Sequence, residues 1–111
     1  MTELNAEDAK IITLARSARA RTDAAEGAAV RDETGRTYAA TSVDLPSLKI
    51  SALKVAVAMA VSSGAEDLEA AAVVTRADAP DPSDVTAVRD LGPQAPVLIA
   101  APNGTLKKTL D

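Results

Sequence analysis

The stretch Ile50-Ser51-Ala52-Leu53-Lys54-Val55-Ala56-Val57-Ala58-Met59-Ala60-Val61-Ser62-Ser63-Gly64 contains the longest uninterrupted apolar run of the chain, Val55 to Val61. A helix from Ile50 to Val61 has almost no polar face, and such a helix is buried on most sides, within its own domain or against another subunit. Gly64 is well placed to end it, because glycine readily adopts the conformation that closes many helices. We therefore predict a central helix that packs against a sheet.

The residues before this stretch predict one helix and one hairpin. Asn5 can cap a helix that runs to about Ala20 and carries an apolar stripe on one side. Two short strands, Ala28–Arg31 and Arg36–Val43, flank the glycine-containing turn Asp32–Gly35. Short strands on either side of such a turn are typical of a hairpin.

The residues after the apolar stretch predict a strand, a short helix and a final hairpin. Leu68–Thr75 is typical of a central strand, and Asp81 with Pro82 forms a helix start that Gly92-Pro93 soon ends. Pro96–Ala101 predicts a strand, and Asn103-Gly104 predicts a two-residue turn into Thr105–Lys108. The order α-β-β-α-β-α-β-β indicates a layered α/β fold in one domain, residues 1–111.

The composition excludes several functions. Among 111 residues there is no Cys and no His, so this subunit cannot contain a Ser-His-Asp triad, a Cys nucleophile or a thiolate or imidazole metal site. The net charge of −4 argues against nucleic-acid binding. The acidic start Met1–Glu7 lacks a signal sequence, and Val55–Val61 is too short to cross a membrane. We expect a cytoplasmic protein without membrane contact.

The chain resembles the cytidine deaminase family of zinc-dependent nucleoside deaminases over nearly its whole length. Thr34-Gly35-Arg36-Thr37-Tyr38 looks like the family's Asp-Gly-x-x-Tyr hairpin, and Ser42-Val43-Asp44 lies where the family has Asn-Val-Glu. Ile50 to Gly64 is similar to the helix that begins Cys-Ala-Glu in the family. The other colinear segments are Gly27–Val30, Leu68–Thr75, Pro82, Gly92-Pro93 and Pro96–Gly104. The resemblance implies a three-layer fold with a mixed five-stranded sheet whose last two strands form a hairpin.

The chain departs from the family at the residues that carry the chemistry. Enzymes of this class use Cys or His ligands to hold a zinc ion that activates water, and a glutamate to move the proton. By resemblance, the ligand positions hold Ser51, Ser83 and Thr86, and the glutamate position holds Leu53. Neutral hydroxyls are poor zinc ligands. We therefore expect no metal, no cofactor and no catalytic residue, and deamination by the family mechanism is excluded.

Five residues remain as candidates for binding a ligand in the vacated cleft: Ser42, Asp44, Ser51, Ser83 and Thr86. Asp44 and Ser42 stand where the resemblance implies the ribose-binding carboxylate and its Asn partner. A Ca²⁺ or Mg²⁺ site formed by Asp78, Asp81 and Asp84 is disfavoured, because their spacing differs from that of an EF-hand loop.

Two lysines flank the altered motif. Lys49 and Lys54 are interpreted as surface residues at the edge of a buried helix rather than as amine nucleophiles.

Three functional hypotheses stay open. The favoured one is a catalytically inactive relative kept as a scaffold or regulatory subunit, a dimer or tetramer through Ile50–Val61, with a further protein partner still to be identified. The second is a module that binds a nucleoside or a small anion. The third is a deaminase with unconventional chemistry.

At the altered site we expect Ser51, Ser83 and Thr86 to lie close together, with Leu53 filling the space. The starts of two helices attract anions. An inward-turned Asp84 would argue against anion binding.

Overall fold

The computed structural model describes residues 4–111, which form three helices and seven strands. In chain order these elements are α1 (Ala6–Thr22), β1 (Gly27–Asp32), β2 (Thr37–Thr41), β3 (Val43–Leu45), β4 (Leu48–Ile50), α2 (Ala52–Ser62), β5 (Leu68–Val74), α3 (Pro82–Leu91), β6 (Val97–Ala100) and β7 (Leu106–Leu110). None of the helices in this part of the chain is long and apolar enough to cross a membrane.

Five of the strands form one mixed sheet in the order β2-β1-β5-β6-β7. β1 runs antiparallel to both β2 and β5, β5 runs parallel to β6, and β6 runs antiparallel to β7. A parallel pair needs a crossover connection, and α3 supplies it between β5 and β6. The predicted mixed five-stranded sheet is confirmed, with Leu68–Val74 as its middle strand.

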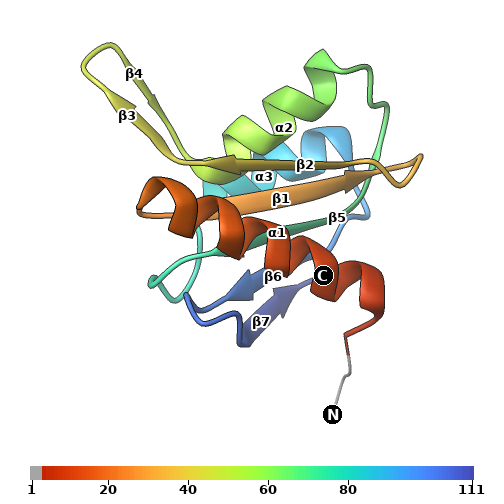
Figure 1. Ribbon diagram of the computed structural model, residues 1–111. Helices are drawn as coiled ribbons and strands as arrows, with labels where there is room; N and C mark the ends of the chain where they lie inside the picture. Colours follow the sequence, from red (N-terminus) through yellow and green to blue (C-terminus); the bar gives the residue numbers. More distant parts are fainter. Residues whose placement is uncertain (1–3) are drawn as a thin grey trace.

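The helices cover both faces of the sheet and make three layers (Figure 1). Side chains alternate between the faces of a strand, so β5 and β6 contribute to two separate cores. One core lies under α1 and is built around Ile11, Ile12, Ala72, Val74 and Leu98. The other lies under α2 and α3 and is built around Leu53, Ala56, Val73, Val88 and Ile99. The predicted three-layer α/β architecture is therefore confirmed.

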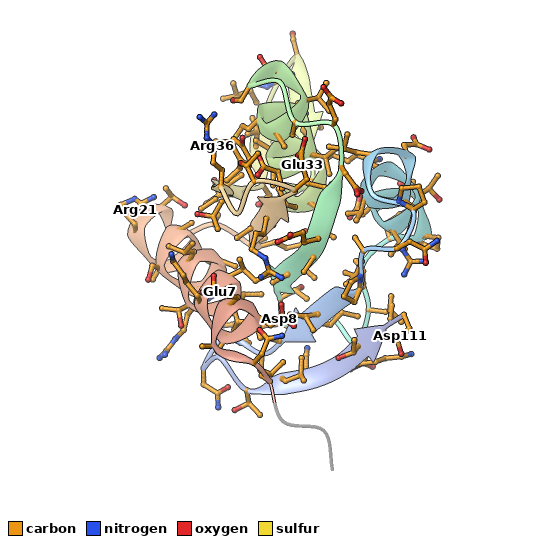
Figure 2. The ribbon with its side chains drawn as sticks, turned by 90° about the vertical axis from the view of Figure 1, so that its right-hand side faces the viewer. Glu7, Asp8, Arg21, Glu33, Arg36 and Asp111 are labelled. Atoms are coloured by element: carbon orange, nitrogen blue, oxygen red, sulfur yellow. The ribbon has the colours of Figure 1, made fainter. Side chains whose placement is uncertain are left out.

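The first helix begins where the sequence predicts. The Asn5 side chain accepts a hydrogen bond from the backbone N–H of Asp8 at 2.8 Å, and α1 ends at Thr22, two residues beyond the predicted end. Asp8 lies on the side of α1 that faces the sheet, whereas Arg21 points outward (Figure 2). Asp8 pairs with the buried Arg31 of β1 at 3.1 Å, and Glu69 of β5 pairs with the same guanidinium at 2.9 Å. The Asp8–Arg31 ion pair thus connects α1 to the sheet.

A second hairpin, β3–β4, lies where the sequence predicted the end of a strand and the start of a helix. The strand predicted to reach Val43 ends at Thr41, and Val43–Leu45 pairs with Leu48–Ile50. This hairpin projects from the body of the molecule (Figure 1). Three-residue strands with exposed Leu45 and Leu48 show no burial pattern for sequence analysis to detect.

The apolar helix consequently starts two residues later than predicted, at Ala52. Ser51 is its N-cap, and the Ser51 hydroxyl accepts a hydrogen bond from the backbone N–H of Lys54. Ser63 is the C-cap, and Gly64 follows with a φ of +95°. Glycine adopts this left-handed conformation without steric cost, so the predicted role of Gly64 in ending the helix is confirmed.

The predicted last hairpin is confirmed, but the prediction of a two-residue turn at Asn103-Gly104 is wrong. β6 ends at Ala100 and β7 starts at Leu106, and the pairing register shifts between Ile99 and Ala100. The backbone N–H of Ala101 donates to the Thr105 carbonyl at 2.8 Å, and the Asn103 side chain accepts from the N–H of Thr105. The N–H of Gly104 donates to the Ala101 carbonyl at 2.8 Å, so Pro102 and Asn103 are the middle residues of a tight turn, and Gly104 follows with a φ of +92°.

Candidate functional site

The starts of α2 and α3 lie side by side on the same face of the sheet (Figure 1). The second of these starts was predicted correctly, because Asp81 caps α3 by accepting from the backbone N–H of Ser83 at 2.9 Å, and Pro82 is the first helical residue. Backbone and side-chain hydrogen bonds with Ser83, together with the charge of Lys54, lower the pKa of the Asp81 carboxyl. The N-termini of α2 and α3, each with partial positive charge from its unpaired backbone N–H groups, therefore lie close together.

Side chains from both helices form a polar cluster at this place. The Ser51 hydroxyl donates to Oδ1 of Asp84 at 2.7 Å, and the Lys54 ammonium donates to the Ser83 hydroxyl at 2.9 Å. The Lys54 Nζ lies 3.7 Å from Oδ1 of Asp84. The Asp84 side chain is only 5% exposed, whereas that of Lys54 is 43% exposed. We name Ser51, Lys54, Ser83 and Asp84 the interhelix cluster.

Two of the three residues predicted at zinc-ligand positions, Ser51 and Ser83, belong to the interhelix cluster. Asp84 contacts Ser51, Lys54 contacts Ser83, and Lys54 lies close to Asp84. Thr86 does not take part: it is exposed, and its hydroxyl donates to the Pro82 carbonyl at 3.1 Å within its own helix. A threonine in a helix satisfies its hydroxyl in this way when no other partner is near. Of the three hydroxyls expected to lie close together, those of Ser51 and Ser83 take part in the interhelix cluster, and that of Thr86 is bonded within its own helix.

Leu53 lies in the core under α2. It is 0% exposed, and it packs in the same core as Val30 and Ile99 of the sheet. A fully buried leucine of this kind stabilises the fold by removing apolar surface from water. It can neither donate nor accept a proton.

Ser42 directly precedes the projecting hairpin, and Asp44 lies on its first strand, β3. Asp44 is paired with Lys49 of β4 at 2.6 Å, and both side chains are exposed. The Ser42 hydroxyl accepts from the backbone N–H of Glu26 at 3.4 Å. Within residues 4–111, neither side chain is hydrogen-bonded to Ser51 or Ser83. Within the described residues, the five predicted ligand-binding residues therefore do not form one hydrogen-bonded cluster.

The inward turn of Asp84 was named from the sequence as an alternative. The contact of Lys54 with Ser83 was not expected, because Lys54 was interpreted as a surface lysine. Lys54 stands three residues after the Ser51 cap, and Asp84 three after the Asp81 cap, which puts each in the first turn of its helix. That shared position was the available signal, but it does not say that the two first turns face each other.

The donors at this site do not fit the zinc ion that the family resemblance implies. Zinc prefers thiolate, imidazole or carboxylate ligands, whereas Ser51 and Ser83 offer neutral hydroxyls beside a lysine ammonium. Over residues 4–111, no three acidic, Cys or His side chains are grouped as metal ligands. Asp81 and Asp84 make separate contacts, to the Ser83 backbone and to the Ser51 hydroxyl.

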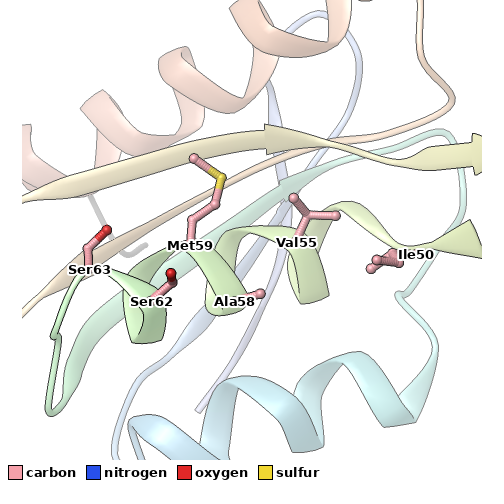
Figure 3. Close-up of a pocket in the computed structure, with 6 residues that line it drawn as sticks. All are labelled: Ile50, Val55, Ala58, Met59, Ser62 and Ser63. Atoms are coloured by element: carbon pink, nitrogen blue, oxygen red, sulfur yellow. The ribbon is translucent and has the colours of Figure 1, made fainter. Parts of the chain in front are cut away.

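A second feature is the outer face of α2 (Figure 3). Five α2 residues are buried against the domain, but Met59 and Val61 are 39% and 54% exposed. A shallow pocket lies along this face, lined by Ile50, Val55, Ala58, Met59, Ser62 and Ser63. One side of the helix is thus covered by the domain, and the outer side is partly exposed. We name the pocket residues the α2 outer face.

The fold is that of the nucleoside deaminases that act on cytidine. The chain is similar to the cytidine deaminase of Burkholderia pseudomallei, with a TM-score of 0.78 and 23% identity over 90% of this chain and 88% of that one. It is also similar to the cytidine deaminase of Mycobacterium leprae, with a TM-score of 0.70 and 17% identity over 97% and 95% of the two chains.

The sequence itself carries the family's pattern. The family described as cytidine deaminase-like matches residues 4–104, so the chain belongs to the cytidine deaminase-like family. The comparison with curated proteins finds no match.

Proposed function

We propose that this chain is a non-deaminating member of its family that serves as a scaffold or interaction subunit. The observation that supports the proposal best is the interhelix cluster, in which Lys54 and Asp84 satisfy Ser51 and Ser83 at the positions that correspond to zinc ligands. Deamination in this class needs an activated water and a carboxylate that moves the proton. The buried Leu53 replaces that carboxylate by an alkyl group.

Binding of a small anion or a nucleoside at the same place is the second candidate, and two contacts argue against it. The Asp84 carboxylate is turned inward between the helix starts, where an anion would have to bind. Asp44, which corresponds to the ribose-binding residue, is paired with Lys49 on the projecting hairpin. We therefore favour the scaffold over the binding module.

The first prediction concerns zinc and activity. Protein purified after growth with added zinc should contain far less than one zinc per chain and should release no ammonia from cytidine above background. The physical reason is that neutral hydroxyls and an ammonium do not retain Zn²⁺. Elemental analysis and an ammonia assay measure both. About one zinc per chain together with cytidine turnover would contradict the proposal and favour the unconventional deaminase.

The second prediction concerns assembly. We propose that copies of the chain associate as a dimer or tetramer through the α2 outer face, because exposed apolar surface along a buried helix is costly in water. Light scattering at micromolar concentration should report more than one chain. Met59→Lys should yield folded monomers, since Met59 is partly exposed in the single chain.

The matched control places the same charge on an exposed position of α1. Ser17→Lys lies on an exposed part of that helix and should leave the assembly intact. A native chain that remains monomeric at high concentration would refute self-association. An oligomer that Met59→Lys leaves intact would place the interface on another surface.

A further inference from the structure

Asp84 is a buried ionisable residue. The scaffold proposal does not explain why a carboxyl group is buried at this position. It is the third residue of α3, and its side chain is 5% exposed. Burying a carboxylate is unfavourable unless it is paired and hydrogen-bonded. Both of its close polar contacts come from α2: the Ser51 hydroxyl at 2.7 Å and the Lys54 ammonium at 3.7 Å. The carboxylate of α3 is thus held by groups of the neighbouring helix.

The charges around the cluster explain why a carboxylate is needed there. The first turn of α2 consists of Ala52, Leu53, Lys54 and Val55, so its only charge is positive. A lysine near a helix N-terminus is unfavourable, because the backbone dipoles already place positive charge there. The start of α3 adds a second positive end. Asp84 supplies negative charge to both helix starts and to Lys54 at once.

We propose that the Asp84 carboxylate is an internal ligand of the site, which joins α2 to α3 where the family places a metal and which keeps external anions out. The inference rests on the part of the proposed function that excludes zinc, and it is independent of self-association. It accounts for the bridging geometry, since Ser51 and Lys54 stand on one helix and Ser83 and Asp84 on the other. Removing Asp84 should weaken the junction and uncover an anion site.

The third prediction concerns how much Asp84 stabilises the contact between α2 and α3. Asp84→Ala should lower the melting temperature by roughly 10 °C, because one carboxylate deletion leaves Ser51 and Lys54 without their partner. Asp44→Ala is the matched control: it removes an exposed carboxylate paired with a lysine at 2.6 Å and should change the melting temperature by about 2 °C or less. Asp84→Asn, which preserves the shape, serves as the folded variant if Asp84→Ala is too unstable.

A double-mutant cycle measures the interaction between Lys54 and Asp84 separately from their contacts with other residues. Lys54→Met in the Asp84→Asn background should cost less than Lys54→Met alone, because the charge pair is already broken. Lys49→Met is the exposed control for Lys54→Met. An unchanged melting temperature in both Asp84 variants, or strictly additive effects with Lys54→Met, would overturn the cross-link.

The anion site is tested with inorganic phosphate. At constant ionic strength, about 20 mM phosphate should raise the melting temperature of Asp84→Ala or Asp84→Asn by several degrees and leave the native chain and Asp44→Ala unchanged. Equal responses in all chains, or no response in the Asp84 variants, would overturn the blocking role. Zinc in the native protein would instead refute the proposed function, so the two failures are distinguishable.

Discussion

Replacing Leu53 by glutamate, which restores the side chain that the family uses to move protons, should unfold the protein and not create a deaminase. Leu53 is 0% exposed and lies in the core under α2. Removing a buried leucine costs about 2–5 kcal/mol, and an unpaired carboxyl in the same space adds several kcal/mol more. The total is comparable to the whole stability of a small domain, about 5–15 kcal/mol.

Urea denaturation followed by circular dichroism measures this effect. We expect Leu53→Glu to lower the free energy of unfolding by about 5 kcal/mol or more, to the point where little folded protein remains at 37 °C. Leu53→Met is the control, because it conserves volume and should cost less than about 1.5 kcal/mol. A Leu53→Glu protein with native stability would mean that this side chain reaches water, contrary to its burial.

Removing Asp32 should have the next largest effect. Asp32 is the last residue of β1 and is 2% exposed. Both of its carboxylate oxygens accept hydrogen bonds from residues of the β1–β2 turn and of β2. Oδ1 accepts from the Thr34 N–H, the Thr34 hydroxyl and the Arg36 N–H at 2.9, 2.7 and 3.1 Å, and Oδ2 accepts from the Tyr38 hydroxyl at 2.8 Å. Asp32→Ala leaves these donors without their partner, so we expect a loss of about 3 kcal/mol in the free energy of unfolding.

The same contacts make stability depend on pH. Burial alone would raise the pKa of the Asp32 carboxyl, but the hydrogen bonds from Thr34, Tyr38 and Arg36 outweigh burial and lower the pKa below its ordinary value of 3.8. A lowered pKa in the folded state means that the carboxylate stabilises the fold above the unfolded pKa. This contribution is lost as the pH falls from about 4 through the folded pKa.

Denaturant melts between pH 7 and pH 2 test this dependence. The native chain should lose stability steadily below about pH 4, and Asp32→Asn should show a smaller loss over the same range. Asparagine is the matched variant, because its amide keeps the size of the side chain and does not titrate. Identical pH profiles for the two proteins would show that other carboxyls dominate the acid transition.

Much of the fold was predictable because its signals are local. Asn5 and the pair Asp81-Pro82 cap their helices through residues two or three positions away, so their spacing alone identifies the helix starts. The apolar runs of β5 and β6 predict buried strands for the same reason. The hairpin β3–β4 escaped prediction because its short exposed strands carry no such pattern.

The sequence by itself determined which chemistry the chain lacks. Without Cys and His, neither a thiolate nor an imidazole metal site is available in this chain, wherever its side chains lie. Such conclusions need only residue types. The order of the helices and of the five strands of the main sheet also belongs here, because each follows from periodicity and caps within a few residues.

Only the tertiary structure decided which side chains meet at the starts of α2 and α3. Ser51 and Asp84 are 33 residues apart, and so no local pattern shows that they meet at 2.7 Å. It decided equally that Lys54 reaches Ser83, that Thr86 turns to its own helix, and that Asp44 projects away with Lys49. Each of these outcomes depends on how α2, α3 and the hairpin pack, and packing is a property of surfaces brought together from distant parts of the chain.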